Sequence, residues 1–182
     1  GMEHLLLGAD HLLVVLGLAF LVRELRPLVL TLTAFTLGHS LTLCLLALSL
    51  VQVNAALVEV GIALSLVALA LSLLRQQERS PEAQRSAQRT LPWLALSLGL
   101  LHGLGFAGAL AETGLPEHQI PLSLLGFNLG IECAQLLVVL GVAALRRLLP
   151  HMFGRRAQQA MAYAMGAIAA MWCIERGWAW FS

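Results

Sequence analysis

Six long apolar blocks constrain the fold of this chain more than any other feature of its sequence. Each block is near or above the roughly 20 residues that a helix needs to cross a hydrocarbon core. Strands of a membrane barrel alternate apolar and polar residues, and these blocks do not alternate. We therefore predict an all-α, polytopic membrane protein. It forms a single transmembrane domain over residues 1–182, a bundle of six helices at about 4–22, 27–51, 55–74, 91–112, 120–145 and 156–181.

Charged residues are few, and arginine supplies all the positive ones. Charged residues make up 12% of the chain, against about 25% in soluble domains. Lysine is absent, so arginine supplies all 11 positive charges against 10 acidic residues. This composition excludes most soluble enzymes and any protein that binds nucleic acid through a basic face. We expect membrane lipid and a metal ion as partners and no nucleic acid, with a homo-oligomer left open.

The arginines predict an orientation. Ten of the 11 lie in the first, third and fifth joints between blocks, at positions 23–26, 75–89 and 146–156. Residues 75–89 form the one long hydrophilic loop that we predict. Positive joints stay in the cytoplasm, so both termini should be extracytoplasmic. We expect a multi-pass protein of the bacterial cytoplasmic (inner) membrane, with a signal peptide or an extracytoplasmic region upstream of Gly1.

Polar side chains at membrane depth are the informative residues, because each is costly in the bilayer and usually faces a cavity or a partner. The predicted metal ligands are His4, Asp10, His11, His39, His102 and Glu132. Predicted supporting or pathway residues are Glu3, Thr36, Ser40, Glu59, Asn128 and Gln135. Imidazole with carboxylate suits nickel, cobalt or zinc, whereas Cu(I) prefers sulfur ligands.

The first predicted helix poses a geometric problem. His4 and His11 are seven residues apart, which is about 10 Å along a straight helix. They cannot both bind one ion there. Either the chain has two successive sites, or the helix opens near Gly8, where glycine tolerates a break. In a purely structural alternative, Asp10 and His11 form a buried hydrogen-bonded pair that fixes packing.

The second predicted helix carries His39 between two threonines. Thr36 and Thr42 lie three residues before and after His39, near the same face. We expect their hydroxyls to hold the imidazole in one tautomer. Ser40 lacks the G-x-S-x-G context of a hydrolase nucleophile, so a serine hydrolase is excluded.

Two later helices combine small and polar residues. Gly99 and Gly103 flank His102 and should let a neighbouring backbone approach closely. The helix over 120–145 has a polar face and a small-residue face, which predicts a central helix with Glu132 pointing into a polar interior. The polar face carries Asn128, Glu132 and Gln135, and the small-residue face carries Gly126, Gly130 and Ala134.

Several segments resemble the HupE/UreJ family of nickel/cobalt permeases. The resemblance rests on the H-x-x-x-x-x-D-H spacing at His4, Asp10 and His11, and on the segments GADHLLVVLGL, TAFTLGHSLTL, LLHGLGFAGALAE and FNLGIECAQL. It implies secondary uptake of nickel or cobalt, with His4, Asp10, His11 and His102 handling the metal.

One departure from that family concerns its second signature, F-H-G-x-A-H-G-x-E. Here Leu101 replaces the leading phenylalanine and Phe106 replaces the second histidine. The chain resembles a divergent branch whose members often carry an extra extracytoplasmic N-terminal domain.

The sequence therefore predicts a secondary transporter of a divalent transition-metal ion, with nickel or cobalt favoured and zinc as a further candidate. No ATP-binding domain accompanies the helices, and deprotonation of the ligands would couple metal binding to proton release. Two alternatives stay open. One is an intramembrane metalloenzyme that activates water on the same cluster, and the other is an accessory subunit that binds the metal without moving it.

Overall fold

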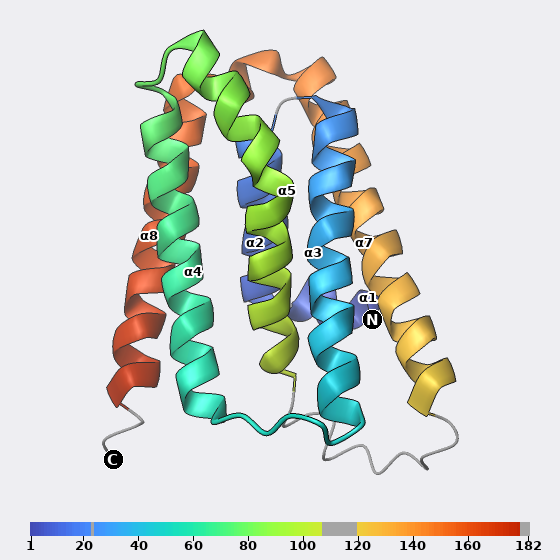
Figure 1. The fold of residues 1–182 in the computed structure, drawn as a ribbon. Coiled ribbons are helices and arrows are strands. Elements are labelled where there is room, and N and C mark those ends of the chain that lie inside the picture. Colours follow the sequence, from blue (N-terminus) through green and yellow to red (C-terminus); the bar gives the residue numbers. More distant parts are fainter. Residues whose placement is uncertain (23, 107–119, 179–182) are drawn as a thin grey trace.

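The computed structural model describes residues 1–22, 24–106 and 120–178, and all regular structure in these ranges is helical (Figure 1). The all-α prediction is thus confirmed. The elements are α1 (Met2–Leu7), α2 (Ala9–Leu21), α3 (Leu25–Ala47), α4 (Ala55–Gln76), α5 (Pro81–Leu104), α7 (Ile120–Leu148), the 3-10 turn η2 (Pro150–Phe153) and α8 (Arg155–Trp178).

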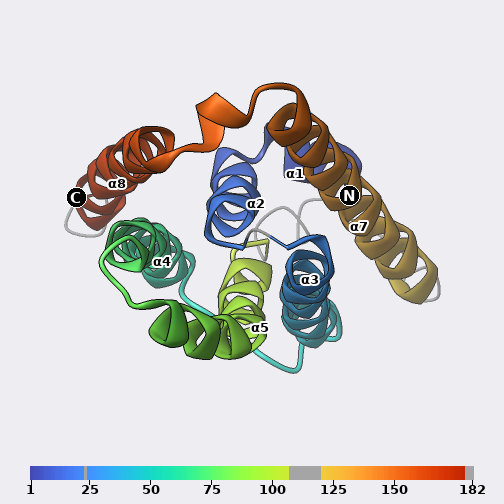
Figure 2. The same cartoon turned by 90° about the horizontal axis from the view of Figure 1, so that it is seen from above.

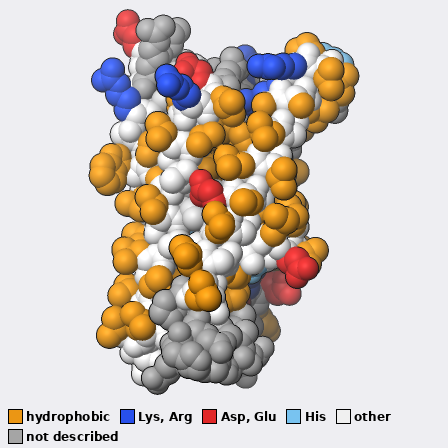
Figure 3. All heavy atoms as spheres, turned by 90° about the vertical axis from the view of Figure 1, so that its right-hand side faces the viewer, with side chains coloured by type: hydrophobic (Ala, Val, Ile, Leu, Met, Phe, Trp, Pro, Cys, Tyr) orange, Lys and Arg blue, Asp and Glu red, His pale blue; other side chains and the backbone are white. Residues whose placement is uncertain are grey.

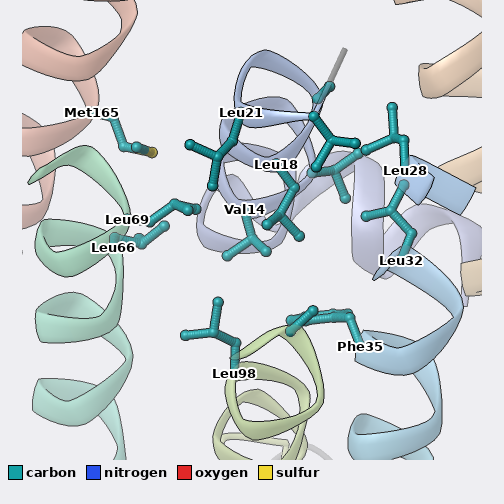
Figure 4. Close-up of a cluster of buried hydrophobic side chains, with 14 of the residues drawn as sticks. Val14, Leu18, Leu21, Leu28, Leu32, Phe35, Leu66, Leu69, Leu98 and Met165 are labelled. Carbon is teal, nitrogen blue, oxygen red and sulfur yellow. The ribbon is translucent and has the colours of Figure 1, made fainter. Parts of the chain in front are cut away.

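Helix α2 lies inside the bundle, surrounded by α3, α4, α5, α7 and α8 (Figure 2). Its sequence, ADHLLVVLGLAFL, is apolar on nearly every side, as expected of a helix without a solvent face. Val14 and Leu18 of α2 meet Leu66 of α4, Leu98 of α5 and Phe35 of α3 in the main apolar core (Figure 4). This core fills the bundle between the Gly8 end of α2 and its Leu21 end.

The prediction that the helix over 120–145 is central is wrong. Helix α7 lies at the edge of the bundle, with Leu122, Leu125 and Leu129 exposed. Its small-residue face is covered only in part. A Cβ atom added at Gly126 would meet nothing within 4 Å, whereas one at Gly130 would lie 3.0 Å from the backbone nitrogen of Met2. The sequence pattern misled because the partner on this face is the short helix α1, which covers only one part of it.

The helix is interrupted at Gly8, so the continuous helix predicted over 4–22 does not form. Gly8 has φ −75° and ψ 97°, an extended backbone that ends α1 and begins α2. A Cβ atom here would lie 2.5 Å from the carbonyl oxygen of His4 and 3.2 Å from His11 Nδ1. The interpretation that the helix opens near Gly8, between His4 and His11, is therefore confirmed.

The long hydrophilic loop predicted over 75–89 is largely helical. Helix α4 continues to Gln76 and α5 begins at Pro81. The hydroxyl oxygen of Ser80 accepts a hydrogen bond from the Ala83 N–H at 3.3 Å, and Pro81 occupies the first helical position. Both are strong helix-start signals, and a polar segment beyond the bilayer can stay helical. The helix predicted over 91–112 thus starts ten residues earlier, and residues 107–112 lie outside the described ranges.

Three of the described helical segments are long and apolar enough to cross a membrane, namely Leu25–Ala47, Ala55–Gln76 and Leu122–Leu148. The apolar helix α2 is shorter because of the break at Gly8. The α2–α3, α4–α5 and α7–α8 connections, which hold the arginine-rich joints, lie at one end of the bundle (Figure 1). Arginine side chains gather at that end and hydrophobic side chains cover the length below it (Figure 3). Six crossings, and which end is cytoplasmic, stay predictions.

Candidate metal centre

Four histidines and one aspartate from four helices converge in the bundle. They form two groups, His4 with His11 and His39, and Asp10 with His11 and His102, and within each group one potential ligand atom per residue lies within 4.8 Å of the others. His11 belongs to both groups. Five of the six residues predicted as metal ligands are thus brought together.

The break at Gly8 makes the first group possible. It turns α1 back against α2, so that the His4 and His11 rings have centroids 4.6 Å apart. On a continuous helix these residues would be about 10 Å apart along the axis. The His39 ring, from α3, lies 5.4 Å from the His11 ring and 6.1 Å from the His4 ring.

Close packing of α3 against α5 positions His39 and His102. A Cβ atom added at Gly99 would collide with the carbonyl oxygen of Phe35, and one at Gly103 would lie 2.5 Å from the carbonyl oxygen of His39. The glycines therefore let the two backbones touch, as the sequence predicted. The contact brings His102 to the α2 side of α5, with its ring centroid 5.0 Å from that of His11.

The centre is rich in buried nitrogen atoms that form no hydrogen bond. Seven buried side-chain polar atoms in the described ranges have no partner, and five of them are imidazole nitrogens. These five are His4 Nε2, His11 Nε2, His39 Nδ1, His39 Nε2 and His102 Nδ1. A buried polar atom without a partner is costly, and imidazole lone pairs are ligands for nickel, cobalt and zinc. The donor set therefore fits a divalent transition metal.

Asp10 sets which nitrogen of His11 is free. Asp10 Oδ1 lies 2.9 Å from His11 Nδ1 and also accepts the His11 backbone N–H at 2.8 Å. A carboxylate oxygen can only accept, so Nδ1 carries the imidazole proton and Nε2 keeps its lone pair. This pair was the structural alternative in the sequence, and it is also the arrangement that orients histidines at metal sites.

Aromatic rings enclose the imidazoles. Phe106 packs edge-on against His4 with centroids 4.8 Å apart, and Phe127 of α7 lies 5.3 Å from the same ring. Phe35 lies 5.4 Å from His102. Phe106 holds the position at which the resembled family signature has its second histidine. Phe35 and Phe127 were not predicted, because a phenylalanine in an apolar helix carries no signal of its own.

The prediction that the hydroxyls of Thr36 and Thr42 hold the His39 imidazole in one tautomer is wrong. Thr36 donates to the Leu32 carbonyl oxygen and, at 3.0 Å, to Gln135 Oε1, while Thr42 donates to the carbonyl oxygens of Gly38 and His39. Neither hydroxyl bonds the imidazole, whose two nitrogens have no partner. Threonine hydroxyls in helices commonly donate to a carbonyl oxygen of their own helix, and Thr36 and Thr42 make such bonds instead of a bond to the imidazole.

Glu132 lies outside both groups. It is half-buried on α7, and its Oε1 accepts a hydrogen bond from Thr33 at 2.8 Å. A second hydrogen bond between α3 and α7 runs from Thr36 to the buried Gln135. Asn128, one turn before Glu132, has a buried oxygen without a partner. A ligand role for Glu132 stays a prediction.

Neither Glu3 nor Glu59 belongs to a ligand group. Glu3 and Glu59 are exposed, and Ser40 donates to the Thr36 carbonyl oxygen at 2.6 Å. One residue near the centre was missed altogether. Ser65 of α4 lies 3.4 Å from His102 Nε2, and no feature of its apolar surroundings in the sequence marks it.

Fold and centre together define an all-helical protein with membrane-length helices around a buried cluster of histidines and an aspartate. The family model described as HupE / UreJ protein matches residues 1–176, and the chain belongs to this family. HupE/UreJ proteins form a family of membrane permeases, so membership indicates a function related to nickel or cobalt transport. No curated protein and no solved structure matches the chain.

Proposed function

We propose that this chain is a secondary transporter that carries nickel or cobalt through the His/Asp centre. The observation that carries the proposal is the pair of ligand groups sharing His11, with five buried imidazole nitrogens left without hydrogen bonds. Magnesium and calcium prefer all-oxygen ligands, so a nitrogen-rich centre discriminates against them.

The shared histidine supports a stepwise handover. Both ligand groups contain His11, and Asp10, a member of the second group, lies 2.9 Å from His11 Nδ1. An ion bound by His4, His11 and His39 can exchange His4 and His39 for Asp10 and His102 without leaving His11. Each step then breaks few bonds at once, which keeps the barrier low for an ion that is already dehydrated.

An apolar seal separates the centre from the arginine-rich end. Leu18 and Leu66 are fully buried and Leu98 nearly so, and with Val14 they fill the space along α2 beyond His11 (Figure 4). A divalent ion cannot cross this layer at an acceptable cost. Release at the arginine-rich end therefore requires α2 to move against α4 and α5, which is the alternating access that a secondary transporter needs.

Orientation forms part of the proposal. We infer that the arginine-rich end is cytoplasmic and that capture begins near Glu3 and His4 on the opposite side. Single cysteines would be introduced at Ser86 and at Gln52 after Cys44, Cys133 and Cys173 are replaced by alanine. A membrane-impermeant reagent should label Gln52→Cys from outside and Ser86→Cys only after lysis. The reverse pattern would overturn the orientation.

Uptake into proteoliposomes tests the function directly. A lumenal metal-sensitive dye would report entry of nickel, cobalt, zinc or magnesium, with and without an imposed pH gradient. We expect saturable nickel or cobalt entry, and a response to the imposed gradient would show that proton movement drives it. His151→Ala is the matched control, since His151 is an exposed histidine outside the centre. Tight binding without uptake would favour the accessory subunit, and metal-dependent hydrolysis without uptake would favour the metalloenzyme.

A further inference from the structure

Ser65 contacts His102, a buried histidine of the centre that makes no hydrogen bond to a carboxylate in the described structure. Ser65 lies half-buried on α4, a helix that contributes no residue to either ligand group. Its Oγ donates to the carbonyl oxygen of Ile62 at 2.7 Å and lies 3.4 Å from His102 Nε2. His102 itself is buried, and its Nδ1 has no partner.

The direction of these bonds selects one tautomer. A serine hydroxyl has a single proton, and the short bond to Ile62 uses it. Ser65 can then offer His102 only a lone pair, and the 3.4 Å contact is a hydrogen bond only when Nε2 carries the imidazole proton. In the neutral ring the lone pair then resides on Nδ1, which is the nitrogen without a partner.

We propose that Ser65 is a positioning residue that holds His102 as the Nε2–H tautomer and so presents Nδ1 to the metal. The inference rests on the proposed metal centre and extends it to a fifth helix. Ser65 does for His102 what Asp10 does for His11, but on the opposite ring nitrogen. Among the described residues, His39 has no such partner on either nitrogen.

The same helix offers a matched control. Ser72 lies seven residues beyond Ser65 and donates to the carbonyl oxygen of Ala68 at 2.9 Å, the same kind of bond back to its own helix. Ser72 is half-buried, like Ser65, and the described structure gives it no imidazole partner. Loss of the hydroxyl at Ser72 thus reproduces the local change in α4 without touching His102.

Nitrogen NMR of ¹⁵N-histidine-labelled, metal-free protein tests the tautomer, with the His102 signal assigned by its loss in His102→Gln. We expect the Nε2–H form in the wild-type protein, a mixture of both forms in Ser65→Ala, and the wild-type pattern in Ser65→Thr and Ser72→Ala. Nickel affinity should fall by roughly 10-fold in Ser65→Ala, as expected when an outer partner of a ligating histidine is removed. It should return in Ser65→Thr.

Two results would overturn the role of Ser65. One is a wild-type tautomer and affinity in Ser65→Ala, and the other is an equal loss in Ser65→Ala and Ser65→Thr, which would mean packing alone. Failure of the proposed function looks different. In that case the wild-type protein binds no nickel or cobalt, while the NMR signals still show the tautomer changing with Ser65.

Discussion

Two polar regions of the bundle are built in opposite ways. The glutamine cluster at the arginine-rich end joins α4, α5 and α8, and it consists of Gln76, Gln77, Gln84, Gln88, Arg155 and Gln158. The His/Asp centre joins α1, α2, α3 and α5. Both regions lie within a largely apolar chain, but they differ in how their polar atoms are satisfied.

In the glutamine cluster, donors and acceptors match. Gln158 Nε2 donates to Gln76 Oε1 at 2.8 Å and to the Leu73 carbonyl oxygen, and Gln76 Nε2 donates to the Leu21 carbonyl oxygen at 2.7 Å. Among the described residues, no buried side-chain atom of this cluster lacks a partner. Amides can pair with one another because each carries both donors and acceptors. The cluster therefore ties the ends of α2, α4 and α8 together without any ligand.

The His/Asp centre instead leaves five buried nitrogens unpaired. Neutral imidazoles each offer one donor and one acceptor, yet here most face one another or phenylalanine rings. The comparison teaches that burial alone does not mark a site. Several unpartnered ligand atoms gathered in one place do, whereas the unpartnered Asn128 Oδ1 and Gln135 Nε2 belong to neither ligand group.

The largest expected effect on metal binding comes from His11→Ala, since His11 serves both ligand groups. We expect nickel affinity to fall by about 100-fold or more, beyond the usual effect of losing an outer partner, and uptake to stop. Titration calorimetry on the purified protein measures the affinity. His151→Ala should bind as the wild-type protein does. Equal nickel affinities in His11→Ala and His151→Ala would mean that the His/Asp centre does not bind the metal and does not differ in this respect from the glutamine cluster.

Gly8→Val should have the next largest effect. Its side chain would push against the His4 carbonyl oxygen and His11 Nδ1, and so force α1 away from α2. We expect about a 10-fold weaker affinity with His4 and His11 both intact. Circular dichroism checks that the helices still form. Gly154→Val is a control at a loop glycine with room for a side chain; a wild-type affinity in Gly8→Val would show that the break does not build the centre.

Phe106→His should change the affinity in the opposite direction. The Phe106 ring lies 4.8 Å from that of His4, so an imidazole there could act as a further ligand to the first group. A gain of up to about tenfold, worth about 1.4 kcal/mol, is expected in nickel titrations. Phe106→Leu keeps an apolar side chain and should give no gain. A loss of affinity in Phe106→His would mean that the ring excludes water rather than leaving a ligand position vacant.

The smallest effect on metal binding is expected in the glutamine cluster. Gln158→Leu removes the donor to Gln76 and Leu73, and should lower the free energy of unfolding by about 1–3 kcal/mol. Thermal unfolding in detergent measures this loss. Nickel affinity at a temperature where the variant is folded should stay within about twofold of wild type. A 10-fold weaker affinity would show that the two regions are coupled.

Much of the centre could be predicted from the sequence. His4, Asp10, His11, His39 and His102 stood out because ionisable groups in apolar helices are costly without a partner. The rise per residue of a helix also left two interpretations of the His4–His11 spacing: two successive metal sites, or a helix interrupted near Gly8. These inferences succeed because they depend on local spacing and on composition.

Helix placement was harder to predict. Gly126 and Gly130 belong to one small-residue pattern, but α1 covers only Gly130. The covering segment lies more than a hundred residues away in the chain, so periodicity cannot reveal which part of a face it reaches. The wrong prediction for residues 81–89 has a different cause: their polar sequence was interpreted as a loop, although Ser80 and Pro81 are local helix-start signals.

By itself the sequence determined the helical class, the family resemblance and most of the side chains that gather in the His/Asp centre, since each follows from residue type and short-range spacing. Only the tertiary structure decided that these side chains form two groups with His11 in common, and that Glu132 bonds Thr33 outside both. It alone decided that Ser65 rather than Thr36 touches a ring nitrogen. The physical reason is that a hydrogen bond depends on atoms within about 3 Å, and which atoms come that close depends on how separate helices pack.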